Sequence, residues 1–271
     1  MNPNNALEDI LNTLKPPNLI EDEGTCLLDG AEPKVVADER GKVLVATLPD
    51  PSDCVVCRGS CHTFGVDADG YSFCSPCPGE RTRHLVRCFN NARIPAKYRH
   101  ATIETLSESG RNAVEGFVHP GKGWWFFGES RAGKTHTMCV LLRYLTLEKG
   151  VRARFCSIAD LLLQIRSTYH QLQHHDDTEA AILHELGGMP VLVLDDVGQF
   201  NGRGDFEVRV LSNLVEHRAN RSGLTTCVTS NVSPSELLRA GEWGMGWSMK
   251  RVVGRLSEMV AKPKRWSGAW K

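Results

Sequence analysis

The stretch GESRAGKT, residues 128–135, matches the pattern G-x-x-x-x-G-K-[ST] and directly follows the apolar run WWFF. Gly128 and Gly133 allow the main chain to turn so tightly that its N–H groups point at phosphate groups. Lys134 then reaches the β- and γ-phosphates, and Thr135 binds Mg²⁺. A strand before the pattern and a helix after it add the positive end of the helix dipole. The sequence therefore predicts an ATP site that comprises Gly128, Glu129, Ser130, Arg131, Ala132, Gly133, Lys134, Thr135 and His136, although we interpret the side chain of His136 as a packing group.

Two carboxylates, Asp195 and Asp196, follow the apolar run VLVL farther along the chain. Asp195 is expected to hold Mg²⁺ through a water molecule, and Asp196 to orient the water that attacks the γ-phosphate. The alternative for both is a polar strand end or a helix cap. Together with the phosphate motif, this pair predicts an ATPase that hydrolyses ATP to ADP and phosphate with Mg²⁺.

Four cysteines form two pairs, Cys54-x2-Cys57 and Cys74-x2-Cys77, with sixteen residues between the pairs. This spacing predicts a structural Zn²⁺ site of four thiolates, which leaves no open position for catalysis. Cys61 or His62 could replace one ligand. The alternative is a set of free buried or redox-active cysteines. Disulfides are not expected, because nothing in the sequence indicates an oxidising compartment.

Composition and charge indicate a protein of the cytoplasm. Apolar residues make up 41% and charged residues 24% of the 271 residues, and the formal net charge is zero. No signal peptide or membrane-spanning run is recognisable. Residues 81–100 contain six lysines and arginines and no acidic residue. Such a basic segment is compatible with nucleic-acid contact, but surface lysine and arginine are common in any protein.

The motifs must be positioned by alternating strands and helices. We expect a short helix at 6–14 and a strand at 41–51, followed by an α/β pattern. Both Ser157 with Asp160 and Ser233 with Glu236 have the spacing of a helix start, and Gly150 has the position of a helix end. Alternation of this kind predicts a parallel sheet with helices on both faces. Strands are expected at 124–127, 151–158, 191–194 and 224–231, and helices at 135–150, 157–170, 179–186, 206–223, 233–240 and 248–260.

Three further segments accompany the phosphate motif and the aspartate pair: 92–106 (ARIPAKYRHATIETL), 229–238 (TSNVSPSELL) and 250–259 (KRVVGRLSEM). From about Cys54 to Lys271 the chain resembles the DnaC/IstB-like AAA+ ATPases, which comprise bacterial replicative helicase loaders and transposition helper ATPases. The resemblance implies an AAA+ P-loop core with a minimal lid, in which neighbouring subunits of an oligomer sandwich ATP.

The resemblance also assigns residues. Asn231 corresponds to the sensor that polarises the attacking water together with Asp196. Arg255 corresponds to the arginine finger that acts on the next subunit's ATP, with Arg251 as the second choice. The chain departs from the wider pattern in two ways. Asp196 stands where many AAA+ proteins have Glu, and the sequence after the arginine helix leaves no room for a full lid.

Arg166 and Tyr169 match the inserted helix that contacts single-stranded DNA in the helicase loaders. Arginine would bind phosphate and tyrosine would stack on a base. The alternative is an ordinary amphipathic helix with Tyr169 half-buried.

The expected organisation is an N-terminal, partner-binding segment (1–50), a zinc-binding module with a basic linker (51–91) and an AAA+ ATPase domain (92–271). The favoured function is an ATP-dependent helicase loader that binds single-stranded DNA and delivers or remodels a replicative DNA helicase. By resemblance the zinc-binding module contacts the helicase, and a DNA-binding ribbon is the alternative for that module. A transposition helper ATPase of the IstB type, or a non-hydrolysing, nucleotide-switched DNA-binding adaptor, are the alternatives for the whole chain.

Overall fold

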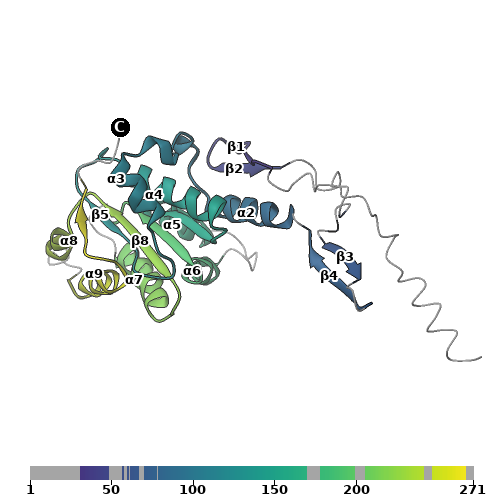
Figure 1. Ribbon diagram of the computed structural model, residues 1–271. Coiled ribbons are helices and arrows are strands. Elements are labelled where there is room, and N and C mark those ends of the chain that lie inside the picture. The colour runs from purple at the N-terminus through teal and green to yellow at the C-terminus, as the bar shows by residue number, and fades with distance from the viewer. Residues whose placement is uncertain are drawn as a thin grey trace, which may run out of the picture. The chain divides into compact units, whose positions relative to one another are not determined.

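The chain forms two compact units in the computed structural model (Figure 1). Unit 1 comprises Met1–Lys34 and Thr47–His84, and unit 2 comprises Val35–Ala46 and Leu85–Lys271. The structure describes residues 31–48, 57, 60, 62–66, 70–77, 79–169, 178–198, 205–240 and 246–266. The helix expected at 6–14 lies outside these residues.

Unit 2 is built on a five-stranded sheet with the strand order β6-β7-β8-β5-β9, in which every pair is parallel. The strand before the phosphate motif, β5, therefore lies between β8 and β9. In open sheets of this kind, ligands bind beyond the carboxyl ends of the strands, where the strand order reverses. The strands are β5 (Trp125–Phe127), β6 (Ala153–Ser157), β7 (Val191–Asp195), β8 (Thr225–Ser230) and β9 (Lys264–Arg265).

Helices cover both faces of this sheet, as Figure 1 shows and as the sequence predicts. The expected helix starts are confirmed, since Ser157 Oγ accepts from the N–H of Asp160 and Ser233 Oγ accepts from that of Glu236. Gly150 adopts the left-handed conformation, with a φ of 66°, after one π-helical turn (η4, Tyr144–Glu148) that extends α4. The helices are α2 (Gly79–Ala92), α3 (Glu108–Glu115), α4 (Lys134–Arg143), α5 (Ile158–Thr168), α6 (Glu179–Gly187), α7 (Asp205–Ala219), α8 (Pro234–Ala240) and α9 (Gly246–Met259), with 3₁₀ turns η2 (Ala96–Tyr98) and η3 (Ile103–Thr105).

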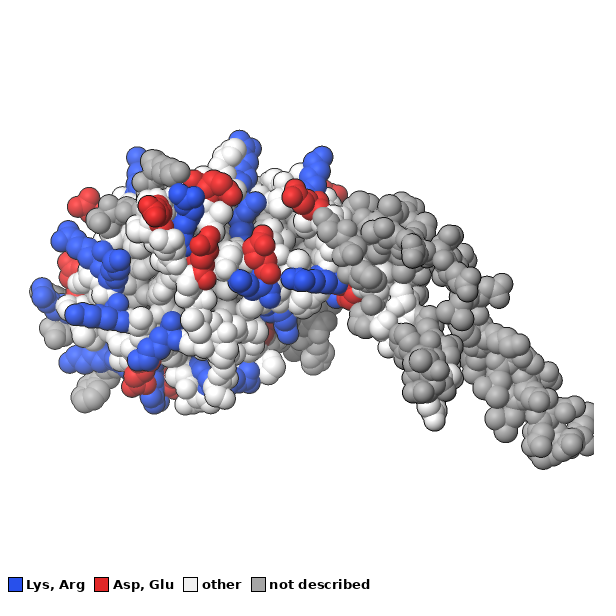
Figure 2. Space-filling model, viewed as in Figure 1, with Lys and Arg blue, Asp and Glu red and all other residues white. Residues whose placement is uncertain are grey.

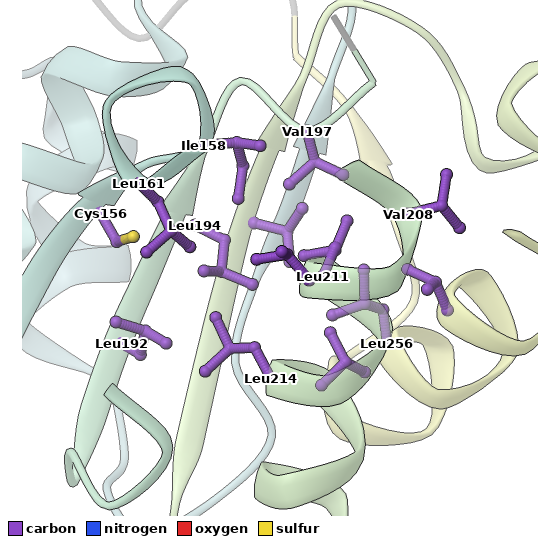
Figure 3. Packing of buried hydrophobic residues seen from close by; sticks show 14 of the residues in the cluster. Cys156, Ile158, Leu161, Leu192, Leu194, Val197, Val208, Leu211, Leu214 and Leu256 are labelled. Atoms are coloured by element: carbon purple, nitrogen blue, oxygen red, sulfur yellow. The ribbon is translucent and has the colours of Figure 1, made fainter. Parts of the chain in front are cut away.

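The run VLVL of β7 is apolar throughout because both faces of the sheet are buried. Leu192 and Leu194 belong to the core cluster that contains Leu211 and Leu214 of α7, as Figure 3 shows. Val191 and Val193 belong to a second cluster, which contains the apolar residues of α4. The two cores are what hold the strand ends, and hence the site, in place.

Two parts of unit 2 differ from the expectation. The strand β9 was not expected, and it pairs with β5 after the arginine-bearing helix α9. The expected strand at 41–51 corresponds to β2 (Leu44–Thr47), which pairs with an unexpected strand β1 (Lys34–Ala37). The side chain of Asn90 fixes β2 to the core, because its Oδ1 accepts from the N–H of Ala46 and its Nδ2 donates to the C=O of the same residue.

Unit 1 contains an antiparallel hairpin of β3 (His62–Val66) and β4 (Ser72–Pro76), in which Phe64 faces Cys74. Turns accompany the cysteine pairs: the N–H of Ser60 donates to the C=O of Cys57, and that of Glu80 to the C=O of Cys77. The expected basic linker is in large part helical, because α2 begins directly after this turn.

Basic and acidic side chains are interspersed over the face of unit 2 seen in Figure 2. Within the described ranges, no helix has the length and apolar character needed to cross a membrane.

Candidate functional site

The phosphate motif forms a tight loop between β5 and α4. Gly128 has a φ of 136° and Gly133 one of 91°, a region in which side-chain-bearing residues are strained. A Cβ on Gly128 would also lie 3.0 Å from the C=O of Trp266, so only glycine fits there without a shift. Arg131 also has a positive φ, of 65°, and is therefore a strained residue that is not a glycine. The loop thus has the geometry that the sequence motif predicts.

Lys134 is almost completely buried at the start of α4. Its ammonium group donates to the carbonyl oxygens of Gly128 and Glu129 at 2.9 and 2.7 Å, and to Oδ1 of Asn231 at 3.0 Å. Burial lowers the pKa of Lys134, and the nearby Asp196 and Asp195 act in the opposite direction. The lysine is therefore held by three oxygens at the position from which it can reach a phosphate.

Asp195, the last residue of β7, accepts two hydroxyl hydrogen bonds on Oδ1. Thr135 donates one at 2.8 Å and Thr229 the other at 2.6 Å. The hydroxyl and carboxylate oxygens brought together here are the donor set that Mg²⁺ prefers. The predicted magnesium ligands thus meet, and they fit the ion.

Asp196 and Asn231 are joined at the ends of β7 and β8. Asn231 Nδ2 donates to Asp196 Oδ1 at 2.9 Å, and the N–H of Asp196 donates to Thr229 Oγ1 at 2.9 Å. Asp196 has a φ of 64°, and a strained non-glycine residue of this kind is typical of functional sites. One continuous network therefore connects Lys134, Asn231, Asp196, Thr229, Asp195 and Thr135.

Burial raises the pKa of both carboxyl groups. For Asp195 the hydrogen bonds from Thr229 and Thr135 partly offset the effect, whereas the charge of Asp195 adds to it for Asp196. Two neighbouring carboxylates with raised pKa values favour the binding of a cation, which removes their mutual repulsion.

Two residues that the sequence motifs did not indicate also belong to this site. Thr229 connects the two aspartates. Burial raises the pKa of Tyr98, in η2, to about 12, and its hydrogen bond with Thr135 acts in the opposite direction. The ammonium of Lys97 lies 5.1 Å from the centre of the Tyr98 ring. The segment before the core therefore forms part of the wall of the phosphate site.

His136 is buried, as expected for a packing residue, and its Nε2 lies 2.7 Å from Oγ1 of Thr105. Because the hydroxyl of Thr105 donates to the C=O of Thr102, its oxygen accepts from the imidazole. This bond ties the segment 102–105 to the first turn of α4.

The two arginines of α9 lie on an exposed helix face. Arg255 pairs with Glu258 at 3.0 Å, and Arg251 pairs with Glu216 of α7. Their side chains are 43% and 63% exposed. Such exposure is what an arginine that acts on another subunit requires.

Arg166 and Tyr169 lie at the end of α5, as expected, and contact residues of α7. Arg166 makes an ion pair with Glu207 at 3.4 Å, and Arg209 donates to the hydroxyl of Tyr169 at 3.3 Å. Both rest near the ring of Phe206. Tyr169 is 57% exposed, which is compatible with both interpretations of this helix, so the contact with DNA stays a prediction.

Three of the four predicted zinc ligands lie in described residues, and Cys54 lies outside them. Cys57 and Cys77 are buried and Cys74 is exposed. Arg83 donates to Sγ of Cys57 at 3.4 Å, an interaction that suits a thiolate. Among the described residues no metal-binding group of three or more ligands occurs. The zinc site therefore stays a prediction.

The fold and the site define an AAA+ P-loop core, which confirms the fold class expected from the sequence. Residues 113–240 match the sequence model of the IstB-like ATP binding proteins. The resemblance to the DnaC/IstB-like AAA+ ATPases is thus confirmed.

The relatives are bacterial replication proteins. The replicative helicase loader DnaI of Bacillus subtilis (strain 168) is 25% identical over 144 residues, which are 52% of this chain and 41% of that protein. The replicative helicase loader DnaC of Buchnera aphidicola is 23% identical over 57% of this chain and 59% of its own length. The chain thus matches about half the length of these two relatives.

Two crystal structures support the fold alone. The crystal structure of DnaI has 18% sequence identity to this chain and a TM-score of 0.51. The match covers 65% of this chain and 92% of the DnaI chain. The crystal structure of a candidate primosome component from Streptococcus pyogenes serotype M3 has 22% sequence identity to this chain and a TM-score of 0.50. The match covers 66% of this chain and 92% of that protein's chain.

Proposed function

We propose that this protein is an ATP-dependent AAA+ helicase loader, which hydrolyses ATP with Mg²⁺, binds single-stranded DNA and delivers or remodels a replicative DNA helicase in the cytoplasm. The observation that carries the ATPase part is the continuous network from Lys134 to Thr135 through both aspartates. The similarity to two replicative helicase loaders supports the loading part.

In the proposed reaction, main-chain N–H groups of residues 128–135 bind the phosphates. Lys134 exchanges its three present acceptors for phosphate oxygens. Thr135 and Asp195 hold Mg²⁺, which when bound neutralises charge on the phosphates. Asp196 and Asn231 orient the attacking water, and their 2.9 Å hydrogen bond fixes the carboxylate for this task.

Subunits of an oligomer would complete the reaction site. Arg255, or Arg251 in its place, supplies positive charge to the γ-phosphate of the neighbouring subunit. Because this charge arrives only on assembly, hydrolysis depends on oligomerisation. Arg166 and Tyr169 contact single-stranded DNA, for which Arg166 exchanges Glu207 for a phosphate.

The cysteine module (51–91) would bind Zn²⁺ through Cys54, Cys57, Cys74 and Cys77 and contact the helicase. The buried positions of Cys57 and Cys77 support a structural ion, which would contribute folding free energy to this module.

A transposition helper ATPase is the second candidate, because the matching sequence model is that of the IstB-like proteins. The test has two parts. Phosphate release is measured with and without single-stranded DNA for the wild type and for Lys134→Ala, which should lose nucleotide binding. Co-purification with ATP from host lysate then distinguishes a hexameric helicase from a transposase. A wild type that binds ATP without hydrolysing it would instead indicate a nucleotide-switched adaptor.

A further inference from the structure

A groove of about 610 Å³ lies on unit 2, at the side of the sheet where β5 begins. Its walls are the end of α3, the following segment 116–122, strand β5 and the segment 261–266. The lining residues that matter for binding are Phe117, Trp124, Trp266, Lys122, Lys262 and Lys264. None of the residues that line it is acidic.

Aromatic rings form a continuous series along this groove. Trp124 directly precedes β5, and its ring centre lies 5.3 Å from that of Phe126 in this strand. Phe126 in turn stacks on Trp266 at 4.0 Å. Phe117 meets Trp124 edge to face at 4.9 Å. Phe117, Trp124 and Trp266 remain partly exposed. The rings therefore form one connected series, and part of the surface of its outer members is accessible to a ligand.

Trp266 is fixed by its main chain, since its N–H donates to the C=O of Phe127 at 2.7 Å. Trp124 is likewise fixed, because its C=O accepts from the N–H of Val228 at 2.7 Å. Aromatic side chains on a fixed backbone bind a ligand without a large loss of conformational entropy.

Three exposed lysines, Lys122, Lys262 and Lys264, surround the rings. None of them makes an ion pair within the described part of the chain. Lys264 Nζ lies 5.9 Å from the centre of the Trp266 ring. Exposed rings next to unpaired cations are the combination by which proteins bind unpaired bases and the phosphates that connect them.

We propose that this groove, which we call the aromatic groove, binds single-stranded nucleic acid. Bases stack on Phe117, Trp124 and Trp266, and the phosphates lie against the three lysines. The site is separate from Arg166 and Tyr169, whose arginine is already paired with a carboxylate. A duplex is excluded, because its bases are stacked on one another and offer no free face to the rings.

Charge favours nucleic acid over an apolar peptide as the occupant. A groove built for an apolar segment has no need of three unpaired lysines at its rim, whereas each phosphate of a strand brings one negative charge. The partly exposed tryptophans add stacking, which does not depend on base identity. We therefore expect little sequence preference.

The test is fluorescence anisotropy with a labelled oligothymidylate and the full chain, without nucleotide, over a range of salt concentrations. Lys262→Glu/Lys264→Glu should weaken binding about tenfold or more at low salt and reduce the slope of log Kd against log salt by about 1.4, because each phosphate contact on a single strand contributes about 0.7. The matched control Arg40→Glu/Lys42→Glu reverses two exposed charges elsewhere on unit 2. It should leave the affinity of the groove for the oligonucleotide unchanged.

Stacking is tested separately with Phe117→Ala, which should weaken binding about fivefold or more and leave the salt slope unchanged. Thermal melting of each variant shows whether it is folded, and the surface lysine variants keep the test valid if the aromatic variant is not. Equal affinity of the lysine variants and the control would overturn the proposal. So would equal binding of a duplex, which would point to charge alone, or binding of a peptide in place of the oligonucleotide.

Arg166→Ala, measured in parallel, separates this groove from the end of α5. Loss of binding in that variant alone would place the nucleic-acid contact on α5 and overturn the proposal for the groove. The binding measurement contains no ATP. A negative result would therefore contradict the groove proposal without bearing on the proposed ATPase activity.

Discussion

Oγ1 of Thr229 lies 2.6 Å from Oδ1 of Asp195 and donates to it. The same oxygen accepts from the N–H of Asp196, so one hydroxyl sets the positions of both carboxylates. Thr229→Val keeps the shape of the buried side chain and removes this link. We expect Mg²⁺-dependent ATP hydrolysis to fall about ten- to a hundredfold, as for other residues that orient metal ligands. Thr229→Ser, which keeps the hydroxyl, is the control, and equal rates for Val and Ser would contradict this role.

Asp195→Asn tests the cost of a buried charge. The pKa of Asp195 is raised by burial, so this carboxyl stabilises the fold below its unfolded pKa and loses that contribution as pH rises through the folded pKa. Near neutral pH, without Mg²⁺ and nucleotide, the variant should therefore have the higher Tm, by about 2–4 °C for each kcal/mol gained. The difference should shrink towards acidic pH.

The same variant should not be stabilised by Mg²⁺ and ATP as the wild type is. Thermal melting over pH, with and without Mg²⁺ and ATP, measures both effects. A variant that is less stable than the wild type at neutral pH would show that the hydrogen bonds of Asp195 outweigh its desolvation.

Arg255→Ala should bind ATP normally and hydrolyse it about a thousandfold more slowly, if Arg255 acts on the neighbouring subunit. Lys250→Ala, a change of an exposed basic residue of the same helix, is the matched control, and Arg251→Ala tests the second choice for the finger. Mixing Arg255→Ala with Lys134→Ala should restore part of the activity, because a site with an intact lysine can then meet an intact arginine. No recovery on mixing would contradict action between subunits.

Elemental analysis of the purified protein should find about one Zn²⁺ per chain. Cys54→Ser/Cys57→Ser should lose the metal and become sensitive to proteolysis within 51–91. Cys88→Ser is the control, since a serine can keep the hydrogen bond from Cys88 Sγ to the C=O of Gly150. A folded wild type without metal would refute the zinc-binding module.

Arg218 is a buried charged residue that stabilises the fold and has no assigned role in the nucleotide site. Its buried guanidinium bridges the end of α6 and the start of β8, and burial lowers its pKa to about 10, so it stays charged at neutral pH. Arg218→Met should lower the free energy of unfolding by about 3 kcal/mol or more, because several buried oxygens lose their donor. Urea unfolding measures this, with Arg221→Met, a change of an exposed neighbour, as the control. The acceptors are Thr226 Oγ1 and the carbonyl oxygens of Leu186, Met189 and Thr225.

The sequence was sufficient for the parts of the site that local patterns encode. Glycine spacing predicted the phosphate loop, and carboxylates after an apolar run predicted the edge of the sheet where Asp195 and Asp196 meet. Thr229 was not predicted, because a threonine within a strand is an ordinary β-former and its polar role depends on a partner from another strand.

The strand β9 was missed for a related reason. Lys264 and Arg265 are charged and follow a proline, which is unfavourable for a strand. They can form one because they lie at the edge of the sheet, where side chains reach solvent. The contact of Tyr98 with Thr135 could not be predicted either, since it joins segments that only the folded chain brings together.

The position of β9 also has a consequence for biosynthesis. Trp266 holds β9 beside β5, and its C=O closes the space next to Gly128. Until the ribosome has released this stretch, β5 remains an unprotected edge strand, and the nascent chain carries a phosphate loop with one side open. Before β9 is in place, a nucleotide in this loop would therefore lack one wall of its pocket.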